Sequence, residues 1–442
     1  MKFLTSSEKI KKLRKDLNMK QQDLQDKNIT RGLISMIEIG RRTLKHDTAV
    51  TLARRFNARA EQLGHKLVVD ADYLLRSPED DAELYCLEKL NSKDIVIDDI
   101  KYVLSIADEY NLTSVRAEAH CKLGDINYDK KNYKNSFINY NQSLDIFKNV
   151  KQHEKISYIY WRLGLCKMNL LQYTDCVTYL NFSIHYSLAH DDPRIYELAL
   201  YDIALAYRKL NKIDLCLENI DKYLSTHNRQ DNFTFYIYAN ILKADCFEAK
   251  NDFQSAIDIY NSLETRITDL ESPLLGYIYN NLGLVYCHMN DFENSIKYFN
   301  MAELFKYKFD RPTLSHTHIE KSHVFIKQRL YNKAIESIKE GLNNAVNYDD
   351  MEYLIKGNFM LSRIYEILDD YDRLEKVYLE LVRILKKACE IHNTSDLSLV
   401  YNKLSLIYLS KGNTANTKKY LLLSQDTIRS YNDSTYYSIN IF

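Results

Sequence analysis

Hydrophobic and polar residues recur with helical spacing along most of this chain, and residues 277–305 show the pattern clearly. In the first half, Ile278 and Leu282 fall on one face of a helix, together with the next apolar residues. A polar turn follows at residues 288–291, and a second amphipathic run begins at Phe292. The pattern predicts two helices joined by a tight turn. Neither helix can bury its apolar face alone, so the pair needs neighbours on both sides.

The same pattern repeats at steps of 39, 40 or 43 residues. A small residue marks the middle of each first helix, at Gly124, Gly164, Ala204, Ala244, Gly283, Ser322, Ser362 and Ser405. A large residue stands sixteen positions after each of the first seven markers, at Tyr140, Leu180, Ile220, Tyr260, Phe299, Ile338 and Tyr378. Close packing of two helices requires a small residue at the marker, since a large one would push them apart. With a degenerate earlier copy around Leu84, the register predicts about nine helix pairs.

Composition agrees with an all-α protein, because only 10 Gly and 4 Pro occur in 442 residues. Pro193, Pro273 and Pro312 keep step with the repeat and are expected at helix starts. The 8 cysteines are scattered without a CxxC pair, which favours reduced, buried thiols and a cytoplasmic protein. No leader and no apolar run long enough to span a membrane is apparent.

The net charge of zero hides an asymmetry between the two ends of the chain. Residues 1–66 hold 16 Lys/Arg and 7 Asp/Glu, and the remainder is acidic by the same excess. A small basic module suggests an anionic partner.

Within this basic module the pattern predicts five short helices, at Glu8–Leu17, Gln21–Asp26, Arg31–Ile39, Asp47–Phe56 and from Ala60 onward. The second and third are joined by a tight turn, which is the helix-turn-helix arrangement. Thr30 is a good N-cap for the third helix, and Gly40 is expected to end it. A further connecting helix is expected over Gly64–Arg76, broken by Ser77-Pro78.

The stretch from Lys20-Gln21-Gln22-Asp23-Leu24 to Ser35-Met36-Ile37-Glu38 and Gly40-Arg41-Arg42 resembles the Xre/lambda-repressor type of helix-turn-helix domain. The resemblance implies that this domain binds double-stranded DNA, with the third helix in the major groove. Gln21 would bond a phosphate and brace the third helix, and Arg31 would pair with guanine. The implied DNA-binding residues are Gln21, Thr30, Arg31, Gly32, Leu33, Ser35, Met36, Arg41, Arg42 and Lys45. Alternatively, Leu33 and Met36 pack in the small core and the arginines form a solvated face.

The repeats resemble the tetratricopeptide repeat, although their period is longer than that family's usual one. The expected domains are a helix-turn-helix domain over 1–66, a linker helix over 67–78 and a right-handed tetratricopeptide-like α-solenoid over 79–442. This order of domains resembles the RRNPP family of Gram-positive peptide-pheromone receptors. The resemblance implies a homodimeric quorum-sensing transcription regulator, acting on a palindromic operator and controlled by a short signalling peptide on the concave face. The competing interpretation is a scaffold whose repeats bind a protein partner and recruit it to DNA.

In such a solenoid the first helix of each pair lines the inner face. Counting from the markers gives these candidate peptide-binding residues: Arg162, Tyr201, Asp202, Arg208, Tyr238, Asp245, Tyr277, Asn280, Asn281, His316, Glu320, Lys356, Arg363 and Asn402. Asparagine amides pair with peptide backbone, and cations with carboxylates. The tyrosines could equally be interhelical packing, and Asn280 and Asn281 could be exposed or capping amides.

Motifs for catalysis and cofactor binding are missing, including GxxxxGK[ST], GxGxxG, HExxH and GxSxG. The histidines of His316-Thr317-His318 point apart on a helix, which makes a metal site there a weak hypothesis. The sequence therefore predicts no enzyme, no cofactor and no metal.

Overall fold

The structure is a computed structural model that describes residues 2–150, 153–226, 233–267, 272–389 and 394–439. Apart from one isolated bridge between Asp26 and Ile29, these residues contain no strand. The helices are α1 (Ser6–Asp16), η1 (Gln21–Leu24), α2 (Arg31–Glu38), α3 (His46–Gln62), α4 (Ala71–Leu75), α5 (Pro78–Leu90), α6 (Ile97–Glu109), α7 (Thr113–Asp129), α8 (Tyr133–Asn149), η2 (His153–Lys155), α9 (Ile156–Asn169), α10 (Tyr173–Ala189), α11 (Pro193–Lys209), α12 (Ile213–Thr226), α13 (Phe233–Ala249), α14 (Phe253–Arg266), α15 (Pro273–His288), α16 (Phe292–Phe309), η3 (Arg311–Thr313), α17 (Leu314–Lys327), α18 (Tyr331–Tyr348), α19 (Met351–Ile367), α20 (Tyr371–Cys389), α21 (Thr394–Ser410) and α22 (Thr414–Ile439).

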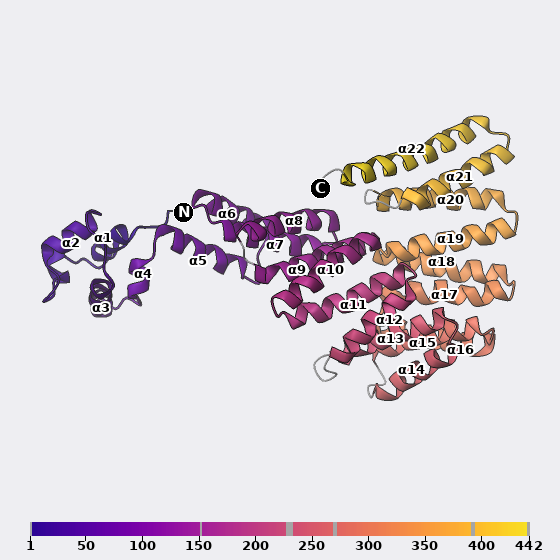
Figure 1. Cartoon of the computed structure of the whole chain (residues 1–442), viewed down its shortest axis with the longest axis horizontal. Coiled ribbons are helices and arrows are strands. Elements are labelled where there is room, and N and C mark those ends of the chain that lie inside the picture. The colour runs from indigo at the N-terminus through magenta and orange to yellow at the C-terminus, as the bar shows by residue number, and fades with distance from the viewer. Residues whose placement is uncertain (1, 151–152, 227–232, 268–271, 390–393, 440–442) are drawn as a thin grey trace. The chain divides into compact units, whose positions relative to one another are not determined.

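From α5 onward the described helices form nine consecutive pairs, as the sequence register predicts (Figure 1). The chain divides into two compact units, residues 1–159 and residues 160–442. The first holds α1–α4 and the first repeats, and the second holds the remaining repeats. The all-α class and the tetratricopeptide-like architecture are confirmed.

The markers lie where the two helices of a pair approach closely. A Cβ added to Gly124 would lie 2.6 Å from the Tyr140 ring, and one added to Gly283 would lie 2.9 Å from the Phe299 ring. Each of these rings belongs to the residue sixteen positions after its marker, and both are fully buried. The spacing found in the sequence is therefore the spacing of a close helix–helix contact in these two pairs.

From the pair α7–α8 onward, each turn inside a pair uses one residue with left-handed backbone, seven positions after the marker. Asn211, Asn251 and Asn290 have φ of 57°, 62° and 63°, and Gly412 has φ of 72°. Asparagine and glycine adopt this region most readily. Pro193 and Pro273 begin α11 and α15 as expected, whereas Pro312 lies in the short 3₁₀ helix η3.

The N-terminal region differs in detail from the predicted five helices. The second helix is only a four-residue 3₁₀ turn, η1, and the fourth and fifth are one continuous helix, α3. The predicted connecting helix from Gly64 is wrong at its start: Gly64 has φ of 72° and ends α3, and only α4 is helical within that segment. In α3, Asn57 accepts from the Val69 amide at 2.8 Å and donates to its carbonyl at 2.7 Å, so the segment after α3 is held extended along it.

Residues 67–75 pack on the helix-turn-helix core, since Val69 and Leu74 are buried in the same cluster as Ile34 and Phe56. The chain start contacts the first repeats, because Phe3 packs on the rings of Tyr85 and Tyr110 at 5.7 and 5.4 Å between centroids. The N-terminal region is thus joined to α5 and α6 by side-chain contacts as well as by the polypeptide chain.

Replacing Gly124 by alanine is expected to destabilise the first unit. The Tyr140 ring cannot retreat, because it is fully buried and its hydroxyl donates to Asp125 at 2.6 Å. Overpacking of this kind costs about 1–3 kcal/mol, which exceeds the gain of up to about 1 kcal/mol in helix propensity. Urea unfolding followed by circular dichroism measures the change.

The matched control is Gly32→Ala in α2, where the nearest atom to an added Cβ is 3.9 Å away. That change is expected to stabilise by about 0.5–1 kcal/mol. The double variant Gly124→Ala/Tyr140→Ile copies the natural pair Ala204 and Ile220, and it is expected to recover part of the loss. Equal effects of the two glycine substitutions would contradict the packing argument.

Candidate functional site

The helix α2 presents the exposed face expected of a recognition helix. Thr30 caps it by accepting from the Leu33 amide at 3.2 Å, and Ile34 and Ile37 anchor it in the core. Thr30, Arg31 and Gly32 are exposed, Met36 is 40% exposed and Ser35 is half-buried. Leu33 packs partly against the core, so the alternative of core packing holds for Leu33 and not for Met36.

A buried carboxylate joins α2 to the elements before it. Glu38 accepts from Arg14 Nε at 2.6 Å and Nη2 at 3.0 Å, and from Gln21 Nε2 at 2.8 Å. Burial opposes ionisation of this carboxyl, but Arg14 and Gln21 hold its pKa below the ordinary value. Gln21 therefore braces α2, as its place in the motif implies.

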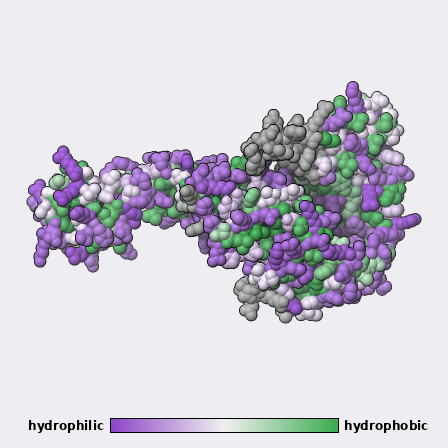
Figure 2. All heavy atoms as spheres, viewed as in Figure 1, coloured by the Kyte–Doolittle hydropathy of each residue, from purple (hydrophilic) through white to green (hydrophobic). Residues whose placement is uncertain are grey.

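The three cations that follow α2 are exposed, namely Arg41, Arg42 and Lys45. On the visible surface of the N-terminal region, hydrophilic residues surround smaller hydrophobic areas (Figure 2). Exposed cations next to a recognition helix suit contacts with a phosphate backbone.

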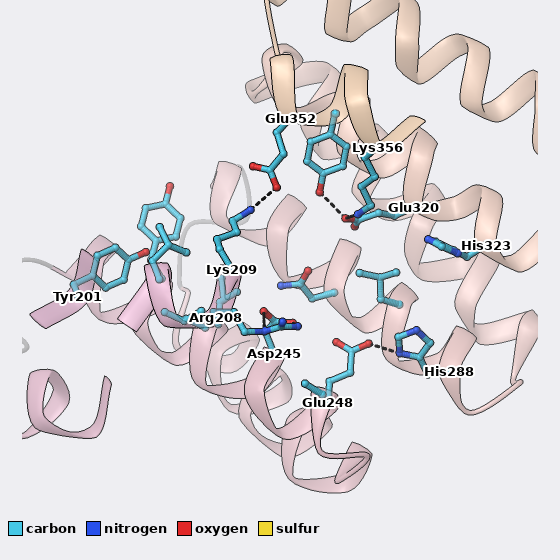
Figure 3. A pocket seen from close by; sticks show the side chains of 18 residues that line it. Tyr201, Arg208, Lys209, Asp245, Glu248, His288, Glu320, His323, Glu352 and Lys356 are labelled. Atoms are coloured by element: carbon cyan, nitrogen blue, oxygen red, sulfur yellow. Dashed lines mark hydrogen bonds and ion pairs between the residues drawn. The ribbon is translucent and has the colours of Figure 1, made fainter. Parts of the chain in front are cut away.

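The second unit contains a cavity of about 570 Å³, lined by the first helices of five successive pairs, α11, α13, α15, α17 and α19. Figure 3 shows side chains from these helices pointing into it. The lining residues are Tyr201, Leu205, Arg208, Lys209, Tyr238, Ile241, Leu242, Asp245, Glu248, Ala249, Asn281, Leu284, His288, Glu320, His323, Glu352, Tyr353 and Lys356. This volume lies within the usual range of ligand pockets.

Two ion pairs connect helices across the cavity. The guanidinium of Arg208 on α11 binds both oxygens of Asp245 on α13, each at 2.9 Å. Lys209 on α11 binds Glu352 on α19 at 2.5 Å, although these residues are 143 positions apart (Figure 3). The superhelix therefore brings α11 and α19 to opposite sides of one cavity.

Glu320 is the centre of a hydrogen-bond network in the cavity wall. Its carboxylate accepts from Asn280 Nδ2 and the Tyr353 hydroxyl, both at 2.6 Å, and from Lys356 Nζ at 2.9 Å. Burial opposes ionisation here, yet the Lys356 charge and the donors hold the pKa of Glu320 well below its usual range. The carboxylate stays charged at any ordinary pH.

The other titratable groups are less firmly charged. Burial raises the pKa of the Glu248 carboxyl, whose Oε1 lies 2.8 Å from His288 Nδ1. Burial lowers the pKa of His323 to about 4, aided by the charge of Lys356. His323 is therefore neutral near pH 7.

The structure brings together seven of the predicted peptide-binding residues in the cavity: Tyr201, Arg208, Tyr238, Asp245, Asn281, Glu320 and Lys356. Three others contact a neighbouring residue instead. Asn280 is buried, with its amide donating to Glu320 and accepting from Thr317 Oγ1 at 2.7 Å, so it reaches a ligand only through Glu320. His316 stacks on Tyr353 and bonds Asp350, and the Tyr277 hydroxyl donates to Asp310.

The remaining four predicted residues also lie outside the cavity lining. Asp202 accepts from Trp161 Nε1 at 2.7 Å, and burial raises its pKa to about 7. Arg162 lies over the Trp161 ring, 5.8 Å from its centroid. Arg363 and Asn402 are exposed.

Sequence reasoning missed Lys209, His288, Glu352 and Tyr353 among the lining residues. Lys209 and His288 stand five positions after their markers, one residue past the last inward position, which is that of Arg208. Glu352 and Tyr353 stand ten and nine positions before their marker, Ser362, at the start of α19. A longer inward register would have identified these residues. The contact between α11 and α19 has no signal in the spacing.

Comparisons with known proteins match both parts of the chain. A helix-turn-helix domain family matches residues 7–76, and a tetratricopeptide repeat family matches residues 276–302. Neither family is catalytic. No curated protein sequence matches significantly.

Among solved structures, the quorum sensor NprR in complex with its cognate peptide NprX is similar over 80% of this chain and 100% of that chain, with a TM-score of 0.50 and 19% identity. The apo form of NprR from B. thuringiensis covers 79% of this chain and 99% of its own, with a TM-score of 0.48 and 19% identity. The Rap conjugation gene regulator of the plasmid pLS20, in complex with the Phr* peptide, covers 97% and 96%, with a TM-score of 0.40 and 14% identity.

The fold and the family matches define a protein with an N-terminal helix-turn-helix domain followed by a tetratricopeptide-like solenoid. The resemblance of this chain to the RRNPP receptors, inferred from its motifs, is confirmed in domain order and in fold.

No helix among the described residues is long and apolar enough to span a bilayer. In the same part of the chain, no three His, Cys, Asp or Glu side chains are grouped as metal ligands.

Proposed function

We propose that this protein is a cytoplasmic quorum-sensing transcription regulator whose DNA binding is controlled by a short peptide bound in the cavity. The observation that carries the proposal is the cavity itself, built from five successive repeats in a chain that begins with a helix-turn-helix domain. The similar fold of the NprR–NprX complex supports a peptide as the ligand.

The chemistry of the lining suits an extended peptide. Asn281 offers both a donor and an acceptor, which matches a backbone amide. Ion pairs such as Lys209–Glu352 can exchange partners with charged groups of a ligand. Tyr201 and Tyr238 provide apolar walls with polar tips.

Peptide control requires that the peptide and the DNA operator differ in which conformation of the protein they bind best. Two chains paired through the solenoid would place two α2 helices about 34 Å apart on a palindromic operator. A peptide that binds one curvature of the repeats better than another would shift that spacing and so change DNA affinity. A change of curvature would alter the distance between α11 and α19, which the Lys209–Glu352 pair joins across the cavity.

The experiment uses the full-length protein and an operator selected from random duplex DNA. Operator affinity is measured by fluorescence anisotropy with and without a pool of synthetic random hexapeptides. Peptide control predicts a change of at least about fivefold in affinity. An unchanged affinity, with a protein partner recovered on the repeats instead, would favour the scaffold function.

Arg31→Ala is expected to weaken operator binding by about 1–3 kcal/mol and to relax preference at one base position, because guanidinium reads a base edge. Arg42→Ala is expected to weaken all duplexes alike and to lower the salt slope by about one, because it removes a phosphate contact. Anisotropy titrations over a range of salt concentrations separate the two effects.

Lys93→Ala, an exposed cation of the first repeats, serves as the control and should leave DNA binding unchanged. Wild-type DNA binding by both arginine variants would refute the assignment of the recognition helix.

A further inference from the structure

The charges of the cavity do not balance. Apart from its two histidines, the lining holds three cations, Arg208, Lys209 and Lys356, against four carboxylates. Three of the carboxylates each form an ion pair with one of these cations, at 2.5–2.9 Å. The pairs are Arg208–Asp245, Lys209–Glu352 and Lys356–Glu320. The cavity therefore carries one carboxylate in excess.

The excess carboxylate is Glu248 on α13. Its side chain is 6% exposed, and no Lys or Arg among the described residues forms an ion pair with it. Its neighbour is His288 on α15, whose side chain is 47% exposed and which is charged only when protonated. Figure 3 shows Glu248 and His288 facing each other at one side of the cavity.

A buried carboxylate without a permanent cation is costly, and the remaining charges around Glu248 add to the cost. Burial raises the pKa of Glu248, and the negative charges of Asp245 on the same helix and Glu320 on α17 raise it further, opposed by His288. An incoming cation would relieve this cost. The His288 ring can give way to it, since nearly half of that side chain is exposed to solvent.

We propose that Glu248 is the subsite for a cationic group of the peptide ligand, either a Lys or Arg side chain or the N-terminal ammonium. This inference rests on the proposed function of the cavity. The apolar residues Leu242, Ala249 and Leu284 line the same cavity and suit the aliphatic stem of a long cationic side chain. Such charge complementarity selects among ligands of similar size.

The test is affinity selection of synthetic random hexapeptides on the immobilised full-length protein, with mass spectrometry of the retained peptides. Four peptide pools are compared. Their N-terminus is either free or acetylated, and their side chains either include Lys and Arg or contain Nε-acetyl-lysine in place of Lys and no Arg. We expect the fully acetylated pool to be retained at least about tenfold less than pools that contain a cation. The two mixed pools distinguish a side chain from the N-terminal ammonium.

Glu248→Gln has nearly the same shape and removes the charge, so it is expected to abolish the preference for cationic peptides, by about 10- to 100-fold. Its melting temperature should equal or exceed that of the wild type, because a carboxylate disfavoured by burial has been removed. The control Glu293→Gln, on the exposed side of α16, should keep the wild-type preference.

The outcomes separate the two levels of the proposal. Retention of peptides without any cation preference, or an unchanged preference in a folded Glu248→Gln variant, would overturn the subsite and leave peptide binding intact. Failure of the wild-type protein to retain peptides from any pool would overturn the proposed function and the subsite with it.

Discussion

Replacing Glu320 by glutamine is expected to lower the free energy of unfolding of the second unit by about 3 kcal/mol. The carboxylate is 6% exposed and receives three hydrogen bonds, from Asn280, Tyr353 and Lys356. The NH2 group of a glutamine side chain would face one of these hydrogen-bond donors, and the charge of Lys356 would lose its carboxylate partner. Urea unfolding followed by circular dichroism at neutral pH gives the difference.

The difference is also expected to depend on pH. The folded-state pKa of Glu320 is lowered, so its contribution is fully present above the pKa of the unfolded carboxyl, about 4.3, and is lost as pH falls below it. Glutamine does not titrate. The stability gap between wild type and variant should therefore be full near pH 7 and shrink on acidification below about pH 4.

The matched control is Glu366→Gln one repeat later. Glu366 accepts from Lys403 at 2.9 Å and from the Tyr378 hydroxyl at 2.8 Å, so its partners are of the same kinds. Its side chain is 37% exposed, and solvent-screened pairs contribute about 0–1 kcal/mol. Similar losses in the two variants, or a gap that does not change with pH, would contradict the central role of Glu320.

The sequence predicts the repeat architecture because each pair contacts mainly its neighbours. The contact between a marker and the residue sixteen positions later recurs at the three glycine markers, Gly124, Gly164 and Gly283. A local contact repeated many times leaves a period in the sequence. That period gives the number of pairs and identifies the helices that line the cavity.

The side-chain network of the cavity leaves no such period. The Lys209–Glu352 pair joins helices 143 positions apart and depends on the accumulated rotation of the repeats, which small differences between pairs decide. Asn280 and its neighbour Asn281 both fall in the inward register, yet the amide of Asn280 is buried against Glu320 and Thr317. Register predicts the face of a helix, whereas the partner of each polar group depends on three-dimensional packing.

The errors in the N-terminal region have local causes. The short turn η1 replaces a full helix because the chain must bend again at residues 25–29 to position α2. The predicted break after Phe56 is absent, since Asn57 uses its side chain to hold Val69 and leaves the helix intact. Asparagine inside a helix usually signals a boundary, and here a contact twelve residues away overrides that preference.

Lys9→Met is expected to destabilise the junction between the N-terminal domain and the first repeat by about 3 kcal/mol. Lys9 on α1 is 1% exposed, and its ammonium donates to the carbonyls of Tyr73 at 2.9 Å and Arg76 at 2.8 Å. It also forms an ion pair with Asp81 in the first turn of α5. Methionine fills a similar volume but leaves these buried acceptors without their donor.

The exposed pair of Lys2 with Glu8, at 2.7 Å, provides the control Lys2→Met at the same end of the chain. Its side chain is 74% exposed and the pair is screened by solvent, so Lys2→Met should leave thermal unfolding essentially unchanged. Limited proteolysis of residues 64–77 and thermal unfolding report on the junction. Because Lys9 joins α1 to the start of α5, Lys9→Met should also reduce the effect of peptide on DNA affinity. If the substitution instead destabilised only the N-terminal domain, DNA binding would be weakened equally with and without peptide. Equal protease resistance of the two lysine variants would show that the chain connection alone holds the domain to the repeats.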